Sequence, residues 1–216
     1  MTRALLLLAV LALAACDTGS GGSSATPPST ATPSTATPAT AATQPSTGVC
    51  QNLTRTALNQ QNSPPPMQID VSKAYTARVN TSRGSFTIAL RPKQAPATVN
   101  NFVCLGQAHY YDGLTFHRVE PGFVVQGGDP LGNGTGGPNY KLPNETNPAP
   151  WKTASVAMAS SAAGVSGSQF FILLGDAPFL ATSGVYNQFG NVIDGFDVVQ
   201  KIQVGDKITS TDIAVQ

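Results

Sequence analysis

The stretch 116–130, FHRVEPGFVVQGGDP, is the most informative part of the sequence and interleaves polar and apolar side chains. Pro121-Gly122 divides it into two short runs, which predicts two strands joined by a turn. Alternation along those strands would bring Arg118 and Gln126 onto one surface beside apolar residues. A guanidinium and an amide in that position can donate hydrogen bonds to a ligand. Taken alone, Arg118 is better explained as a surface ion-pair residue, and His117 is expected to be a structural histidine whose hydrogen bonds are satisfied.

Two other motifs resemble catalytic or cofactor loops but lack the required context. Residues 132–137 satisfy G-x-G-x-x-G, yet Pro138 follows and no helical period begins there, so a surface loop is expected. Residues 164–168 resemble a nucleophile elbow without its final glycine and without a strand–turn–helix pattern. The chain has 2 histidines, His109 and His117, and a serine hydrolase is not expected.

The elements that would position these residues are short and mostly extended. Strands are expected at 74–79 and 85–90 around a turn, and a helix with Pro96 in its first turn and Gly106 closing it. Further β-type runs are separated by Gly, Pro and Asn, at 114–119, 123–126, 155–158, 169–174 and 189–193. A helix at 196–202 and a strand at 211–215 follow. Many short strands with two helices favour an antiparallel sheet closed into a barrel.

Two segments together resemble the signatures of a known family. The stretch 116–130 resembles the signature of the cyclophilin-type peptidyl-prolyl cis-trans isomerases, and 168–172 (SQFFI) resembles their second signature. The stretch 94–102 (QAPATVNNF) is similar to the start of the family's first helix. The resemblance runs from about Tyr75 to the C-terminus. It implies a closed antiparallel eight-stranded cyclophilin-like barrel capped by two helices over residues 73–216.

The resemblance also implies a mechanism and a set of site residues. Rotation about an X–Pro bond needs an apolar slot for the proline ring and a donor aimed at the twisting amide. It needs no nucleophile, metal or cofactor, and none is expected. Arg118 matches the donor and Gln126 the residue that orients it. Phe123, Val124, Phe171, Leu180 and Tyr186 match the walls of the proline pocket, and Ala159, Ser160 and Gln169 match the adjoining groove.

Several positions depart from the family pattern. Val124 stands where many members carry Met, which implies a slightly roomier pocket, and Ser160 stands where eukaryotic members often have Asn. Phe179 occupies the position of the tryptophan associated with tight cyclosporin binding. With Tyr186 in place of His, this resembles the bacterial secreted branch and implies weak cyclosporin binding. Trp151 is expected to be a surface-loop anchor without a role in the site.

The N-terminus predicts export and lipidation. Arg3 precedes an apolar run ending at Ala15, which is typical of a secretory signal peptide over residues 1–15 and too short to span a bilayer. Leu13-Ala14-Ala15-Cys16 resembles the lipobox of bacterial lipoproteins, which implies cleavage before Cys16 and its acylation. The alternative is an ordinary signal peptide with a chance cysteine at the cut. An extracytoplasmic protein, lipid-anchored to the cell membrane in the periplasm or at the cell surface, is expected.

A tether and an extension separate the anchor from the domain. Residues 16–49 are almost wholly Ser, Thr, Pro, Ala and Gly, which predicts a disordered tether. Residues 50–72 form a polar, Pro-rich extension packed on the domain or leading into it. This division explains why charged residues are only 11% of the chain. Without Arg3 and Asp17, the rest of the chain holds 11 of the 12 basic and 10 of the 11 acidic residues. This near-neutral balance argues against a nucleic-acid partner.

The cysteines show no paired metal-ligand spacing. If Cys16 is lipidated, Cys50 and Cys104 remain as an even pair in an oxidising compartment. A disulfide between them would pin the extension onto the first helix. The alternative is two free thiols, with Cys104 a small core residue.

Two functions from different classes remain. The first is a monomeric, membrane-tethered isomerase that assists the folding of exported proteins by acting on their proline-containing segments. The alternative is a cyclophilin-fold module that binds such segments without significant turnover. The presence of Arg118, Phe123 and Gln126 together favours the enzyme.

Overall fold

The computed structural model describes residues 50 and 52–216. The predicted leader, the predicted tether and Cys16 lie outside the described residues. Within the described part, nine strands pair into one sheet, with three α-helices and one 3-10 helix. The strands are β1 (Tyr75–Thr81), β2 (Gly84–Leu90), β3 (Arg118–Glu120), β4 (Val124–Gly127), β5 (Lys141–Leu142), β6 (Ser155–Ser161), β7 (Gly164–Leu173), β8 (Gln188–Asp194) and β9 (Ile208–Val215). The helices are α1 (Arg55–Asn59), α2 (Pro96–Gln107), α3 (Phe196–Val199) and the 3-10 helix η1 (Pro178–Ala181).

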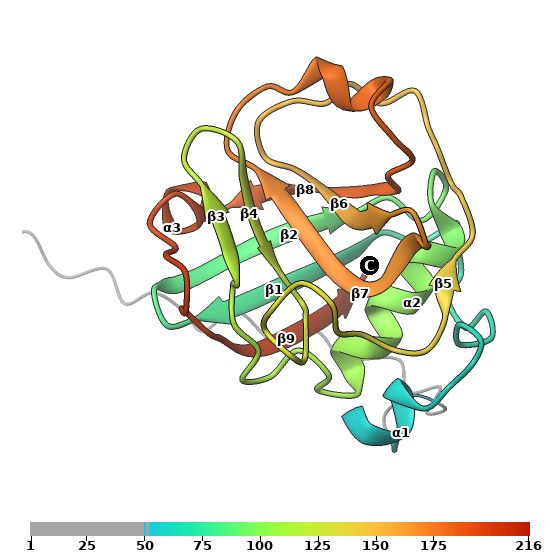
Figure 1. Cartoon of the computed structure of the whole chain (residues 1–216). Helices are drawn as coiled ribbons and strands as arrows, with labels where there is room; N and C mark the ends of the chain where they lie inside the picture. Colours follow the sequence, from blue (N-terminus) through green and yellow to red (C-terminus); the bar gives the residue numbers. More distant parts are fainter. Residues whose placement is uncertain (1–49, 51) are drawn as a thin grey trace, which may run out of the picture. The chain divides into compact units, whose positions relative to one another are not determined.

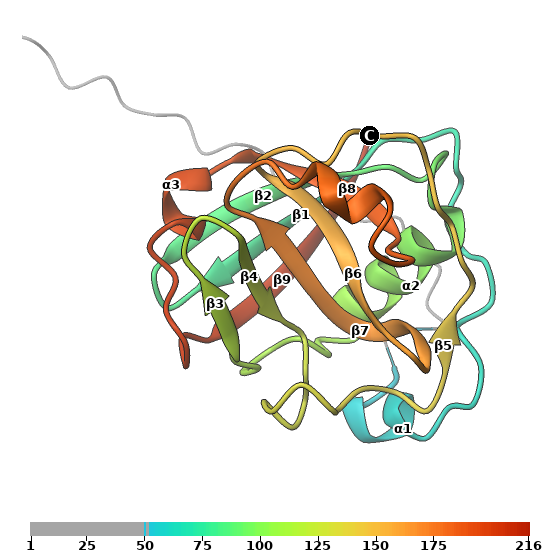
Figure 2. The ribbon, with the colours of Figure 1, turned by 45° about the horizontal axis from the view of Figure 1, so that its top comes forward.

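The sheet is antiparallel and curled, as the sequence predicts (Figures 1 and 2). Its strand order is β3-β4-β7-β6-β8-β2-β1-β9, and β5 pairs with β7 outside this path. The two end strands are linked through the segments that precede them. Thr115 forms an isolated bridge with Lys207, and the Ile208 N–H donates to the Leu114 carbonyl at 2.8 Å.

Alternation along the central strands sorts side chains between two apolar clusters. On β7, Phe170 and Ile172 face the main core, whereas Phe171 and Leu173 belong to a smaller cluster on the opposite face. A shift of one residue in register would exchange the two sets. The pleat of β7 therefore decides which phenylalanine belongs to the core and which reaches the second face.

The hairpin β1–β2 and the helix α2 form where the local sequence predicts them. Pro96 occupies the first turn of α2, where its missing N–H costs no hydrogen bond. The expected role of Gly106 as the closing residue is wrong, because α2 continues to Gln107. A Cβ on Gly106 would lie 3.1 Å from Ile213 of β9, so this glycine lets the helix approach the sheet closely.

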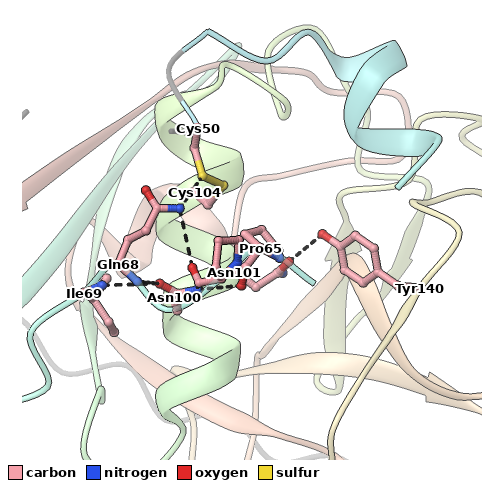
Figure 3. Close-up of a disulfide and its surroundings, with 9 residues drawn as sticks. Cys50, Pro65, Gln68, Ile69, Asn100, Asn101, Cys104 and Tyr140 are labelled. Carbon is pink, nitrogen blue, oxygen red and sulfur yellow. Dashed lines mark hydrogen bonds between the residues drawn. A yellow bond between two sulfur atoms is a disulfide. The ribbon is translucent and has the colours of Figure 1, made fainter. Parts of the chain in front are cut away.

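The extension packs on the domain through a disulfide and buried polar contacts (Figure 3). Cys50 is bonded to Cys104 of α2 across a sequence separation of 54 residues. The Asn100 amide nitrogen donates to the Pro65 and Pro66 carbonyls at 3.1 and 3.0 Å. Leu58 of α1, which the sequence did not predict as helical, is fully buried in the main core.

Two classes of feature are missing from the described part of the chain. No helix within residues 50 and 52–216 is long and apolar enough to cross a membrane. Over the same residues, no three His, Cys, Asp or Glu side chains gather where they could hold a metal ion.

Candidate active site

A two-stranded hairpin brings the predicted donor and its partner together. Arg118 on β3 lies directly opposite Gln126 on β4. The intervening turn uses Gly122 at a φ of 75°, a conformation that glycine adopts without strain. The Phe123 N–H closes the turn by donating to the Glu120 carbonyl at 3.0 Å.

The Arg118 guanidinium is held from two sides. Its Nη1 donates to Oε1 of Gln126 at 3.2 Å. Its Nε and Nη2 both donate to one carboxylate oxygen of Glu120, at 2.8 and 2.6 Å. The guanidinium carbon also lies 5.8 Å from the centre of the Phe123 ring, within the range of a cation–π contact. Sequence reasoning missed Glu120, although its position two residues after Arg118 on a strand places both on one face.

A second amide extends this arrangement toward the glycine loop. The Gln126 amide nitrogen donates to Oε1 of Gln169 at 3.1 Å. Gln169 in turn donates to the carbonyls of Gly134 and Gly136 at 3.0 and 2.8 Å. Each amide is thereby fixed in orientation, and Gln126 presents its oxygen to Arg118.

Asp129 holds the glycine loop in place. Its carboxylate accepts from the N–H groups of Leu131 and Asn133 at 2.8 and 3.1 Å, and from that of Gly134. Burial raises the pKa of Asp129, but the backbone hydrogen bonds outweigh burial and leave the pKa below its usual value. The 132–137 loop begins no helix, as expected, but Asn133 and Gly134 also line the site, which sequence reasoning missed.

Beside Arg118 lies a groove of about 430 Å³ that both polar and apolar side chains line. The predicted residues that line it are Arg118, Phe123, Val124, Gln126, Ala159, Ser160, Phe171, Leu180 and Tyr186. His117, Asn133 and Gly134 line it without having been predicted to do so. Gln169 lies just outside it, against Gln126. The structure therefore gathers most of the predicted site around one opening.

Phe179 stands at the edge of the site. Its side chain is 54% exposed, and its ring centre lies 5.6 Å from that of Phe123. It does not line the groove. Its neighbour in η1, Leu180, is buried and forms part of the groove wall.

Trp151 anchors its loop, as expected, but it does so against residues that line the groove. The residue is 8% exposed and packs in the second apolar cluster with Phe171 and Leu180. Its ring stacks on Phe171 with centres 6.3 Å apart and planes 18° apart, and meets Tyr186 edge-on at 6.0 Å. Trp151 lies in a loop, so no helical or strand periodicity in the sequence marks it as a neighbour of the groove wall.

The expectation that His117 has its hydrogen bonds satisfied is wrong. Both ring nitrogens are buried and have no hydrogen-bond partner among the described residues. Burial lowers the pKa of His117, because the charged imidazolium is poorly solvated there. Burial and the nearby Arg118 charge both favour the neutral ring, while Asp129 opposes them.

Comparison with known proteins decides the family. The family model described as cyclophilin type peptidyl-prolyl cis-trans isomerase/CLD matches residues 76–215. The chain belongs to the cyclophilin-type peptidyl-prolyl cis-trans isomerases. The family expected from the two signatures is thus confirmed, and the chain is an isomerase.

Curated relatives and solved structures agree with this assignment. A peptidyl-prolyl cis-trans isomerase of Synechococcus elongatus is 45% identical over 139 residues, which cover 63% of this chain and 94% of that protein. Peptidyl-prolyl cis-trans isomerase B of Bacillus subtilis is 46% identical over 119 residues, covering 54% of this chain and 82% of that protein. The crystal structure of a Cryptosporidium parvum cyclophilin-type isomerase is 31% identical with a TM-score of 0.58, covering 66% of this chain and 98% of that one. A second crystal structure of that protein was obtained in the presence of the dipeptide Ala-Pro.

Proposed function

We propose that this isomerase acts on X–Pro bonds of exported proteins through Arg118, in the groove that Phe123, Phe171 and Leu180 line. The single observation that carries the proposal is that Arg118, held by Gln126 at 3.2 Å, lines the same groove as the apolar side chains of Phe123 and Phe171. The groove takes the proline ring, and the guanidinium donates to the prolyl amide as it twists. Binding the twisted amide better than the planar one lowers the barrier to rotation.

The chemistry matches what the site supplies. Rotation about a peptide bond faces a barrier of ~18–20 kcal/mol from amide resonance. As the bond twists, the nitrogen regains its lone pair and becomes a better hydrogen-bond acceptor. A fixed donor therefore stabilises a geometry that exists only at the transition state. No proton is transferred in this rotation, so His117, whose ring nitrogens have no hydrogen-bond partner among the described residues, has no part in the proposed step.

A protease-coupled assay on an Ala-Pro peptide tests the proposal. We expect wild type to accelerate isomerisation and Arg118→Ala to lose most of that acceleration. Arg78→Ala removes an exposed arginine whose Nε donates to Asn80, and serves as the matched control that stays active. A wild type that binds the peptide but leaves the uncatalysed rate unchanged would instead support the binding-module alternative.

The cellular setting is part of the same proposal. The lipobox-like Leu13–Cys16 segment and the Ser/Thr/Pro/Ala composition of residues 16–49 support a lipid-anchored, extracytoplasmic enzyme on a tether. The Cys50–Cys104 disulfide supports an oxidising compartment. In cell fractionation, Cys16→Ser should move the protein out of the membrane fraction; retention equal to wild type would refute the anchor.

Two structural expectations also remain proposals. The Thr115–Lys207 bridge and the bond between Ile208 and Leu114 support closure of the sheet into a barrel. Phe179, which stands where the resemblance places a tryptophan, supports weak cyclosporin binding.

A further inference from the structure

A second groove lies next to the proposed proline slot. Two segments, 146–152 and 176–186, enclose a space of about 410 Å³. Both run along the upper edge of the domain in Figure 1, in yellow-orange and orange. Neither Arg118 nor Gln126 lines this space, so it has no part in the proposed catalytic step.

The lining of the second groove is aromatic and proline-rich. Trp151 and Tyr186 contribute rings, and Pro148, Pro150 and Pro178 contribute exposed pyrrolidine surfaces. Among the described residues that line it, the charged ones are Lys152 and Asp176, which form an ion pair of 2.7 Å. Uncharged, aromatic-lined grooves of this kind suit extended apolar or proline-containing peptide. Charged segments gain nothing from them.

The two grooves share a wall. Leu180 and Tyr186 line both of them. The Tyr186 ring meets Phe171 edge-on at 5.7 Å and Trp151 edge-on at 6.0 Å. A polypeptide lying in the catalytic groove therefore needs only to cross this wall to reach the second groove.

The spacing sets which residue of the polypeptide can reach it. The stacked rings of Phe171 and Trp151 have centres 6.3 Å apart, and a ligand on the far side of each ring adds a further contact distance. An extended chain advances about 3.3 Å per residue. Crossing from one groove to the other therefore takes about three or four residues.

We propose that the second groove binds an apolar or proline residue of the substrate polypeptide, three or four residues from the isomerised proline. The proposal rests on the proposed function, because the occupant is the polypeptide held in the catalytic groove. The site would favour unfolded segments with repeated apolar or proline residues over an isolated X–Pro bond.

Three peptides test this. The first is a tetrapeptide with one Ala-Pro bond, which fills the catalytic groove alone. The second is an extended peptide with a proline or leucine three or four residues before or after that bond. The third is the same extended peptide with serine at those positions. Burying one apolar side chain favours binding by about tenfold, so wild type should show a KM about tenfold lower for the second peptide than for the third.

Groove-blocking and control variants isolate the effect. Ala181→Glu places a charge on an exposed position that lines the second groove and not the catalytic one. It should abolish the advantage of the apolar extended peptide and leave turnover of the tetrapeptide within about twofold of wild type. Ala74→Glu adds the same charge at an exposed position in neither groove and should keep the advantage. Equal KM values in wild type for the two extended peptides, or an unchanged advantage in Ala181→Glu, would overturn the proposal.

Fluorescence separates this proposal from the isomerase mechanism. The chain has 1 tryptophan, Trp151, and it lines the second groove. Its emission should shift on binding the apolar extended peptide more than on binding the serine peptide, whether or not the tetrapeptide is isomerised. If wild type failed to isomerise the tetrapeptide but still showed this selective shift, the proposed catalysis would be refuted and the second groove would stand. Equal emission changes with the two extended peptides would refute the second groove.

Discussion

Replacing Glu120 by alanine tests whether Arg118, the proposed catalytic donor, must be held from both sides. Glu120 accepts two hydrogen bonds from Arg118 through one oxygen, at 2.8 and 2.6 Å. Gln126 supplies the opposing contact at 3.2 Å. Without Glu120 the guanidinium keeps only the weaker of its two partners and samples orientations that do not face the substrate amide. Because the donor acts at the transition state, the loss should fall on kcat more than on KM.

Solvent exposure sets the size of the effect. Charge-assisted hydrogen bonds contribute about 1.5–3 kcal/mol when buried. Here the side chains of Arg118 and Glu120 are 44% and 50% exposed, so screening reduces the pair to about 1 kcal/mol. Since about 1.4 kcal/mol corresponds to a tenfold change in rate, Glu120→Ala should lower kcat about fivefold. Glu120→Gln keeps an acceptor oxygen without the charge and should lower kcat only about twofold.

The assay is protease-coupled isomerisation of an Ala-Pro tetrapeptide at low and high salt. Asp194→Ala removes an exposed carboxylate outside the groove and controls for the change in net charge. Salt should narrow the gap between wild type and Glu120→Ala, because it weakens an exposed ion pair. A Glu120→Ala enzyme with wild-type kcat, or a faster one, would show that Glu120 does not position Arg118.

Three further predictions concern stability and inhibitor binding. Cys50→Ser/Cys104→Ser should lower the free energy of unfolding in urea by up to about 4 kcal/mol, because the disulfide closes a separation of 54 residues and so restricts the unfolded chain. A loss below about 1 kcal/mol would contradict this chain-entropy argument. Burial lowers the pKa of His117 in the folded protein. The contribution of His117 to stability is therefore complete above its unfolded-state pKa of about 6.5 and is lost as the pH falls through the lower folded pKa. Unfolding curves from pH 7.5 to 5 should show this loss in wild type and not in His117→Gln. Phe179→Trp should strengthen cyclosporin binding measured by calorimetry, and an affinity equal to wild type would show that this position does not limit it.

Elements with a local physical cause were predictable. The β1–β2 hairpin follows from alternation on both sides of a turn, and Pro96 marks the start of α2 because it fits a first helical turn. The pairing of Arg118 with Gln126 follows from the turn at Gly122 between two alternating strands. In each of these elements the residues that interact are close in sequence.

Elements fixed by distant partners were not predictable. The N-terminus of α2 has no side-chain cap of its own, and Glu145 from a remote loop accepts the Ala97 and Thr98 N–H groups at 2.7 and 2.8 Å. The short strand β5 exists through its pairing with β7. The helix α1 is too short to be stable alone and is held by the burial of Leu58.

The sequence by itself determined the family, the reaction and most residues around the groove. Each of the two signatures is a continuous stretch of chain, and together they hold the predicted donor Arg118, its partner Gln126 and several of the predicted walls of the proline pocket. Only the tertiary structure decided what supports them. Strand alternation places Glu120 on the same face as Arg118, but only the folded side chains show that two Arg118 N–H groups donate to one Glu120 oxygen. Trp151 stacks on Phe171 because the loop that carries it packs against the second apolar cluster. Contacts between residues that are distant in the chain leave no periodic signal, so the second groove could be found only in the folded molecule.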